Sequence, residues 1–309
     1  MNRQRLLANT MLATGTLALA RHLSTPQIRI LAYHRILDDH LDPRSLTDAG
    51  LFSATASGFS RQLRWLSRHF DCITFHDLAS GNYQRPLIIT FDDGYEDNHR
   101  LAWPILRSLG LKAVFFVTTD FIDGHGAFWF DRASAAASIA QPDEPIAALL
   151  TQLKRLNSDE RGRQVHLLEQ QAGLATPAQG PAMSWQALRE MADSGMEIGS
   201  HSCSHAVLAN ESVERIHAEL AISRQRIEQQ LGHPCTSLSY PVGGRSAVNG
   251  IVEQQAEQCG YQYACSYISG TNRLPLERPL MLNRQHVEID QSHAEFIAST
   301  SMPALLGYR

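Results

Sequence analysis

Two pairs of side chains in this sequence could do chemistry together. Asp92 and Asp93 are adjacent carboxylates that follow the apolar run 86–91, and His201 and His205 are imidazoles four residues apart after a second apolar stretch. Taken alone, an Asp-Asp-Gly sequence is typical of a turn, and two histidines at this spacing are typical of one face of a surface helix. One carboxylate and two imidazoles, however, suit a divalent metal with an open position, which leaves the second carboxylate as a base. Because each pair follows a strand-like run, the combination predicts a metal-assisted hydrolase.

These motifs resemble those of a known family. The segment Thr-Phe-Asp-Asp-Gly at 90–94 and the His-Ser-x-x-His at 201–205 are similar to the hallmarks of the NodB-type polysaccharide deacetylases, carbohydrate esterase family four. The resemblance implies that Asp92 is the general base and that Asp93, His201 and His205 bind the metal. It also implies removal of an N-acetyl group from an amino sugar in a glycan. Zinc is the expected ion by abundance and family habit, while cobalt, nickel and iron suit the same ligands.

A third motif narrows the resemblance. The segment 31–36, Leu-Ala-Tyr-His-Arg-Ile, closes a strand-like stretch that begins at Ile28. A subgroup that resembles the poly-N-acetylglucosamine deacetylases carries its general acid in such an N-terminal Tyr-His context, which makes His34 the candidate acid. His286 is the weaker candidate, since His34 already fills this role. The alternative is that His34 only hydrogen-bonds a neighbouring backbone group.

The loop 238–244, Leu-Ser-Tyr-Pro-Val-Gly-Gly, corresponds to one in which the family often carries Arg-x-Pro-Tyr. The resemblance makes the backbone N–H of Val242 a donor to the oxyanion, and a backbone donor does not depend on its side chain. Tyr240 and Pro241 are the candidate substrate contacts here. The alternative is a plain proline and glycine loop after a strand.

This loop departs from the family pattern at two positions. Ser239 stands where the family carries arginine, and Val242 stands where it carries an aromatic residue. The second change removes an aromatic wall, so it concerns substrate preference more than chemistry. Arg284 is the candidate substitute for the missing arginine and a candidate substrate contact. A surface arginine on the last strand is the equally weighted alternative.

The elements that must position these residues alternate between strand-like and helical patterns. Strands are predicted at 28–33, 72–75, 87–91, 113–118, 197–200, 237–240, 261–266 and 282–287. Helices are predicted near 59–69, 98–109, 185–194, 213–231 and 248–258. Such alternation predicts an α/β fold with a parallel sheet, and the candidate residues lie at strand ends, where barrel active sites are built. The resemblance implies a distorted barrel of about seven βα units.

A helical insertion interrupts this alternation around 131–181. The segment 128–132, Phe-Trp-Phe-Asp-Arg, precedes it and contains Trp129, a candidate substrate contact because aromatic faces suit pyranose rings. The alternative is that these aromatic residues anchor the inserted helices on the barrel.

Composition excludes several classes of protein. The chain has 309 residues, 43% of them hydrophobic, and a net charge of −4, so it can bury a large core and shows no basic patch for nucleic acid. It contains no apolar run of about 18 residues, so no transmembrane helix is expected. The five cysteines have neither zinc-site nor disulfide-framework spacing, which favours a reducing compartment.

The N-terminus allows two interpretations. Residues 1–20 combine a basic start with a moderately apolar stretch, and Ala-Leu-Ala at 18–20 resembles a signal-peptidase site. Polar residues interrupt the apolar part, so an amphipathic helix on a membrane surface or on the barrel itself is also consistent. We expect retention of a signal-like or amphipathic segment at 1–25 before a deacetylase domain at 26–309. A cytoplasmic or membrane-peripheral location is expected ahead of a periplasmic or secreted one.

The expected function is a metal-dependent hydrolase that removes N-acetyl groups from an amino-sugar polysaccharide or glycan. One alternative is the same fold acting on a non-polymeric amide or a lipid-linked sugar. A second is an inactive glycan-binding module, against which the full set of acid, base and metal-ligand candidates argues. A role in the bacterial envelope or in exopolysaccharide metabolism is implied by the resemblance alone.

Overall fold

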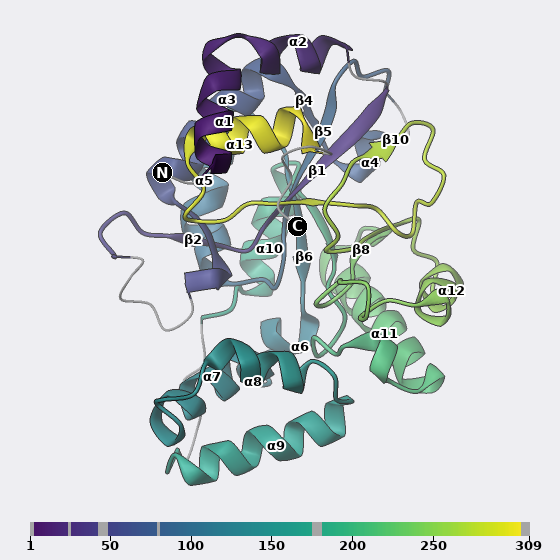
Figure 1. The fold of residues 1–309 in the computed structure, drawn as a ribbon. Helices are drawn as coiled ribbons and strands as arrows, with labels where there is room; N and C mark the ends of the chain where they lie inside the picture. Colours follow the sequence, from purple (N-terminus) through teal and green to yellow (C-terminus); the bar gives the residue numbers. More distant parts are fainter. Residues whose placement is uncertain (1–2, 24–25, 43–48, 79–80, 175–180, 304–309) are drawn as a thin grey trace.

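A curled parallel sheet forms the centre of the fold (Figure 1). The structure, a computed structural model, describes residues 3–23, 26–42, 49–78, 81–174 and 181–303. Neighbouring strands follow the order β1 (Gln27–Tyr33), β5 (Pro86–Phe91), β6 (Val114–Val117), β7 (Glu197–Ser200), β8 (Ser237–Ser239) and β9 (Tyr263–Cys265). Each neighbouring pair in this order is parallel, as the predicted alternation requires.

The segment after β9 closes the sheet into a distorted barrel. Leu282 forms a parallel bridge with Cys265 of β9, and β11 (Gln285–His286) pairs with β1 at Leu31 and Ala32. Two short strands pair with the amino-terminal ends of the barrel strands. The strand β4 (Asp71–Ile73) lies beside the start of β5, and β10 (Asn272–Arg273) runs antiparallel to the start of β1. The predicted fold class is therefore confirmed.

The strands β1, β5 and β6 are largely apolar because both of their faces are buried. Along β1, Ile28 and Ile30 belong to one apolar cluster with Ile88, whereas Leu31 and Tyr33 belong to a second cluster that includes the surrounding helices. Successive side chains of a strand point to opposite faces, so a sheet covered on both sides needs continuous apolar runs. This is why the runs were recognisable in the sequence.

The predicted helices cover the barrel close to their predicted positions. They are α3 (Ala56–His69), the π-helical η3 (Asn98–Ala102) continued by α5 (Trp103–Ser108), α10 (Trp185–Asp193), α11 (Val213–Leu231) and α12 (Gly250–Gln258). Two short helices, α4 (Phe75–Leu78) and α6 (Thr119–Ile122), were not predicted. Polar N-caps set several of their starts, as at Ser212, whose side chain accepts a hydrogen bond from the N–H of Arg215. Two 3-10 turns, η2 (Ala49–Leu51) and η4 (Leu208–Asn210), lie in connections.

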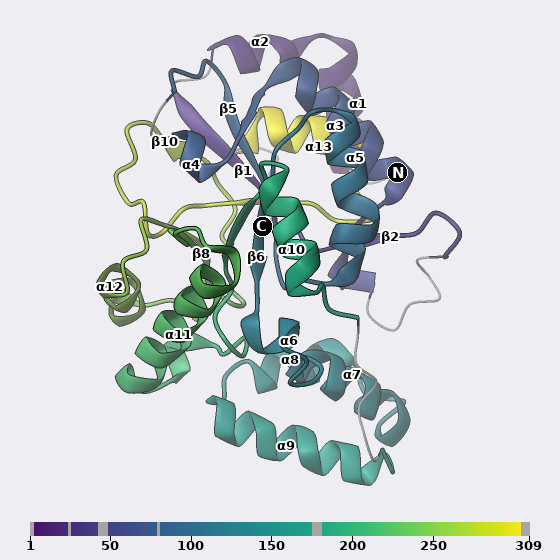
Figure 2. The same cartoon turned by 180° about the vertical axis from the view of Figure 1, so that it is seen from behind.

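The predicted insertion is present as three helices, α7 (Trp129–Ala140), α8 (Ile146–Leu153) and α9 (Ser158–Gln171). Both views place these helices at one pole of the molecule (Figures 1 and 2). The insertion follows β6 and α6, so it lies at the carboxyl ends of the barrel strands. Part of the predicted range, 175–180, lies outside the described residues.

The N-terminal segment forms α1 (Arg3–Ala13) and α2 (Thr16–Leu23) at the opposite pole (Figures 1 and 2). Ala8 and Leu17 are buried, and Arg5 pairs with Glu295 of α13 (His293–Ser301) at 3.3 Å. Packing on the barrel was one of the interpretations of this segment. Within the described ranges, every helix is too short or too polar to span a bilayer.

The sequence prediction missed some elements and extended others. The parallel pair β2 (Arg35–Leu37) and β3 (Phe52–Thr55) and helix α13 were not predicted. The strand predicted at 72–75 ends at Ile73, and only Gln285 and His286 of the range 282–287 form a regular strand. Such short elements contain too few residues to display a period, and their partners are distant in the sequence.

Candidate active site

A cavity of about 370 Å³ opens between the carboxyl ends of the strands and the inserted helices. The predicted site residues that line it are His34, Asp92, Asp93, Trp129, His201, His205, Tyr240, Val242 and Arg284, whereas Pro241 and the weaker candidate His286 do not. The structure therefore gathers side chains from several barrel units at the pole where barrel enzymes carry their active sites.

Asp93, His201 and His205 form a buried cluster that fits a divalent ion. The Oδ1 atom of Asp93 lies 3.5 Å from Nε2 of His201 and 3.4 Å from Nε2 of His205. Among the described groups this Oδ1 has no hydrogen-bond partner, and the three candidate ligand atoms lie within 4.8 Å of one another. Nδ1 of His201 lies 2.7 Å from the carbonyl oxygen of Ser239, a contact that directs Nε2 towards Asp93.

The electrostatics of this cluster favour a bound cation. Burial would raise the pKa of Asp93, but its contact with the two imidazoles holds that pKa well below the usual value. Burial lowers the pKa of His205, which favours the neutral imidazole that coordinates metals. For His201, the charges of Asp92 and Asp93 outweigh burial and raise the pKa. A field that attracts a proton to this imidazole also attracts a metal ion.

The backbone of the site is strained. In the described part of the chain, the non-glycine residues with positive φ are Asp93 (79°), Ser202 (64°), His205 (58°) and Val242 (63°). Such conformations cost of the order of 1–3 kcal/mol each, and a β-branched residue such as Val242 is an outlier among them. All of these residues lie in or between the predicted motifs. Strain at functional positions persists only where surrounding contacts hold it.

Arg284 pairs with Asp92 inside the barrel. Its Nη1 donates to Oδ1 of Asp92 at 2.8 Å and its Nη2 to Oδ2 at 2.7 Å. The guanidinium also donates hydrogen bonds to the carbonyl of Ser266 and to the hydroxyls of Thr90 and Ser239. Arg284 is fully buried, so the alternative of a surface arginine is wrong. Burial would raise the pKa of Asp92, but the charges of Arg284 and His201 lower it to about 2, which keeps this carboxylate ionised.

His34 follows β1 and lies at the same pole as the metal-ligand candidates. Its Nε2 is 4.0 Å from Oδ2 of Asp92, its ring meets Tyr267 edge-on, and its side chain is 22% exposed, so a substrate could reach it. The backbone N–H of His34 donates to the hydroxyl of Ser53, but the imidazole remains directed to the cavity. Its role as the acid stays a prediction.

His286 is placed differently. Its ring stacks on Tyr267 with a centroid distance of 3.6 Å. Burial and the charge of Arg284 lower its pKa to about 4, so it carries no acidic proton to donate at neutral pH. These observations disfavour His286 as the general acid.

The loop after β8 presents a backbone donor to the cavity. The carbonyl of Pro241 accepts the N–H of Gly243 at 2.7 Å, a tight turn that places Val242 at its apex. Among the described residues, the N–H of Val242 donates no hydrogen bond. Tyr240 is buried and its hydroxyl donates to the carbonyl of Leu280, so this hydroxyl is already engaged. Pro241 lies outside the cavity lining, contrary to the predicted contact, because it shapes the turn instead.

The aromatic segment before the insertion packs on a metal-ligand candidate. The rings of Phe128 and Phe130 meet His205 edge-on, and the indole N–H of Trp129 donates to the carbonyl of His205 at 3.3 Å. The guanidinium of Arg161 lies over the indole ring of Trp129 at 4.8 Å. The segment therefore anchors the insertion, while Trp129 and Phe130 also line the cavity.

Several contributors to the cavity had no signal in the sequence. Leu150, Thr151 and Lys154, at the end of α8, line the cavity, as does Tyr267. In the sequence, the α8 residues belong to an ordinary amphipathic helical pattern. Tyr267 follows a predicted strand but belongs to no recognisable motif. The predicted motifs identify the reacting groups, but only the structure identifies the other residues that line the cavity.

The fold is thus a distorted α/β barrel whose cavity holds a candidate ligand set for a divalent ion beside the ionised carboxylate of Asp92. The chain belongs to the polysaccharide deacetylase family, which matches residues 80–264. The name of this family agrees with the hydrolase predicted from the sequence.

Individual relatives support the same assignment. The Bacillus subtilis (strain 168) protein YxkH, whose name assigns it provisionally to the polysaccharide deacetylases, is 26% identical over 179 residues, 58% of this chain and 43% of that protein. The chain thus matches less than half of this relative's length. The fold is similar to that of the Streptococcus pyogenes deacetylase PplD in complex with acetate (TM-score 0.64, 19% identity, 90% and 99% of the two chains). It is also similar to a de-N-acetylase from Aggregatibacter actinomycetemcomitans (TM-score 0.61, 16% identity, 89% and 99%).

Proposed function

We propose that this chain is a metal-dependent deacetylase that removes N-acetyl groups from the amino sugars of a glycan. The observation that carries the proposal is the convergence of Asp92, His34 and the three metal-ligand candidates on one cavity. Family membership supports deacetylation, and the name of the Aggregatibacter protein, a de-N-acetylase of the same fold, agrees with an amide substrate. Acetate, found in the Streptococcus structure, is the expected product.

Each residue has a distinct part in this reaction. Asp93, His201 and His205 would hold the divalent ion, which when bound polarises a carbonyl and lowers the pKa of water; zinc is the proposed ion. Asp92 takes the proton of the attacking water, and Arg284 keeps this carboxylate ionised and fixed in direction. The N–H of Val242 is free to donate to the oxyanion. His34, which lines the same cavity, protonates the departing amine.

The position of His34 supports a finer assignment. A general acid after the first strand, with Arg284 directly before the last strand as the partner of Asp92, is the arrangement that we infer for a poly-N-acetylglucosamine deacetylase-like enzyme. The neutral state of His286 supports the same choice of acid.

The test combines metal analysis with product release. Purified protein should contain or bind about one divalent ion per chain, and acetate and free amine should appear together from N-acetylglucosamine oligomers. Release from a small acetanilide but not from oligomers would favour the non-polymeric amide alternative. Glycan binding without acetate release, in protein loaded with zinc, would identify an inactive binding module.

We further propose a membrane-peripheral location through the N-terminal helices. Leu6, Leu7, Leu12 and Leu19 of α1 and α2 are 53%, 47%, 41% and 59% exposed, although Ala8 and Leu17 on the other side are buried. The charged residues of segment 1–23 are all basic, namely Arg3, Arg5 and Arg21. Although Arg5 pairs with Glu295, this composition suits an anionic lipid surface.

Sedimentation with phosphatidylglycerol vesicles tests this location. The wild-type chain should sediment, and a variant with the four exposed leucines changed to serine should remain in solution. Leu167→Ser, at an equally exposed leucine of α9 (56%), is the matched control and should sediment. Wild-type protein that stays in solution would refute the proposal. Because α1 and α2 lie at the pole opposite the insertion, such docking would direct the cavity away from the bilayer (Figure 1).

A further inference from the structure

The loop that carries both histidines needs external support. It follows β7 directly, and within it Ser202 and His205 adopt the left-handed conformation that non-glycine residues avoid. Local side chains hold two of its amides: the hydroxyl of Ser200 accepts the N–H of Ser202, and the hydroxyl of Ser202 accepts the N–H of His205. The amides of Cys203 and Ser204, at the apex of the loop, have no such local acceptor.

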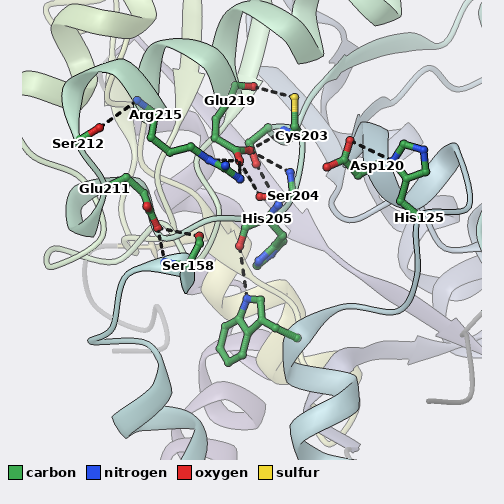
Figure 3. Close-up of polar contacts among 12 residues, drawn as sticks. Asp120, His125, Ser158, Cys203, Ser204, His205, Glu211, Ser212, Arg215 and Glu219 are labelled. Carbon is green, nitrogen blue, oxygen red and sulfur yellow. Dashed lines mark hydrogen bonds and ion pairs between the residues drawn. The ribbon is translucent and has the colours of Figure 1, made fainter. Parts of the chain in front are cut away.

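Glu219 of α11 supplies that acceptor (Figure 3). Its Oε2 accepts the N–H of Cys203 at 3.0 Å and the N–H of Ser204 at 2.9 Å, and its Oε1 accepts the hydroxyl of Ser204 at 2.6 Å. Arg215, one turn earlier on the same helix, donates to Oε1 through Nε at 3.1 Å and Nη2 at 2.9 Å. The carboxylate is only 2% exposed, so these contacts take the place of water.

Through these contacts Glu219 controls the position of His205, one of the metal-ligand candidates. Cys203 and Ser204 lie between His201 and His205, so the carboxylate fixes the path of the chain from one imidazole to the other. His205 follows Ser204 immediately, and its Nε2 must stay near Oδ1 of Asp93, at 3.4 Å, for the three ligands to share one ion. A loop that relaxed from its left-handed conformations would turn this imidazole away.

We propose that Glu219 is a positioning residue that sets the metal affinity of the site by holding the 201–205 loop, with Arg215 as its charge partner. The proposal rests on the metal site of the proposed function. Substitution of residues that hold metal ligands in place commonly lowers the affinity of the site for its metal 10- to 100-fold.

The substitution Glu219→Gln tests the role of the charge with little change of shape. An amide can accept the two backbone N–H groups with its oxygen, but its NH₂ then faces the donors of Arg215, so the network cannot be kept whole. We expect the affinity of the metal-free protein for zinc, measured by competition with a chromophoric chelator, to fall 10- to 100-fold. Excess zinc should restore most acetate release.

Cobalt and matched variants separate positioning from general damage. The visible spectrum of the cobalt-loaded protein reports ligand geometry, and it should change in Glu219→Gln. Glu214→Gln, at an exposed glutamate of the same helix, should match the wild type in affinity and spectrum. Arg215→Gln leaves the carboxylate in place and should weaken zinc binding less, which keeps the test valid if Glu219→Gln does not fold.

The outcomes distinguish this proposal from the proposed function. Unchanged zinc affinity and cobalt spectrum in a folded Glu219→Gln protein would overturn the positioning role. Wild-type protein that binds zinc but releases no acetate would overturn the substrate assignment and leave the role of Glu219 intact. A wild-type protein that binds neither metal would overturn both.

Discussion

The ion pair between Arg284 and Asp92 allows a quantitative prediction. In Arg284→Met the five donated hydrogen bonds of the guanidinium are lost and Asp92 remains buried without its charge partner. Removing one partner of a buried pair typically costs about 3–5 kcal/mol, a large part of the roughly 5–15 kcal/mol that stabilises a domain. We expect urea unfolding at pH 7 to show a loss of this size.

The pH dependence follows from the direction of the pKa shift. In the wild type the pKa of Asp92 is lowered from 3.8 to about 2. This shift contributes about 2 kcal/mol to the free energy of unfolding. The contribution is present above pH 4 and is lost as the pH falls towards 2. Without Arg284 the opposing effect of burial is left with less compensation, so the pKa rises. The stability deficit of Arg284→Met should therefore be smaller in acid than at pH 7, and the acid limb of its pH–rate profile should move to higher pH.

A double-mutant cycle provides the decisive control. In Arg284→Met combined with Asp92→Asn no charge is left unpaired, so the double variant should be more stable than the sum of the single changes predicts. Arg284→Lys keeps the charge but not the two parallel hydrogen bonds and should fall between Met and wild type. Additive stability effects, or an Arg284→Met protein as stable as wild type, would refute the reasoning.

Four further outcomes test the roles of individual groups. Asp92→Asn should keep zinc bound and lower kcat about 10²- to 10⁴-fold; loss of zinc instead would mean that Asp92 and Asp93 have been interchanged. His34→Ala should leave the metal bound, cripple deacetylation and alter the pH–rate profile, whereas His286→Ala should be far milder; the reverse order would assign the acid to His286. Val242→Gly keeps the backbone N–H and relieves the strain of the positive φ, so activity should persist. The free energy of unfolding should equal that of the wild type or exceed it by up to about 1 kcal/mol. A large fall in kcat would exclude the backbone-donor role. Chelation should abolish acetate release and lower the Tm, and zinc at about 100 times its Kd should return about 2.7 kcal/mol of stability; an unchanged Tm would argue against a resident ion.

Local sequence determined the reacting groups and most of the barrel. The strands β1, β5 and β6 were predicted within a residue or so, since each is a largely apolar run with neighbours in the sequence that define its ends. The strand β7 has its predicted bounds although it contains Glu197 and Ser200. The motifs at 90–94 and 201–205 were recognisable for the same reason. Residue types and short spacings are properties of adjacent positions, and they can be read without knowing the fold.

The partners of these groups depended on the tertiary structure. Arg284 lies 192 residues from Asp92, and the sequence favoured a buried arginine no more than a surface one. Glu219 occupies the helix predicted at 213–231, where no motif indicated a site, yet its carboxylate holds the loop between His201 and His205. The positive φ angles of Asp93 and Val242 follow from contacts, not from residue type. Closure of the barrel is what joins the last segment to the first strand, and it alone brings these distant residues within hydrogen-bonding distance.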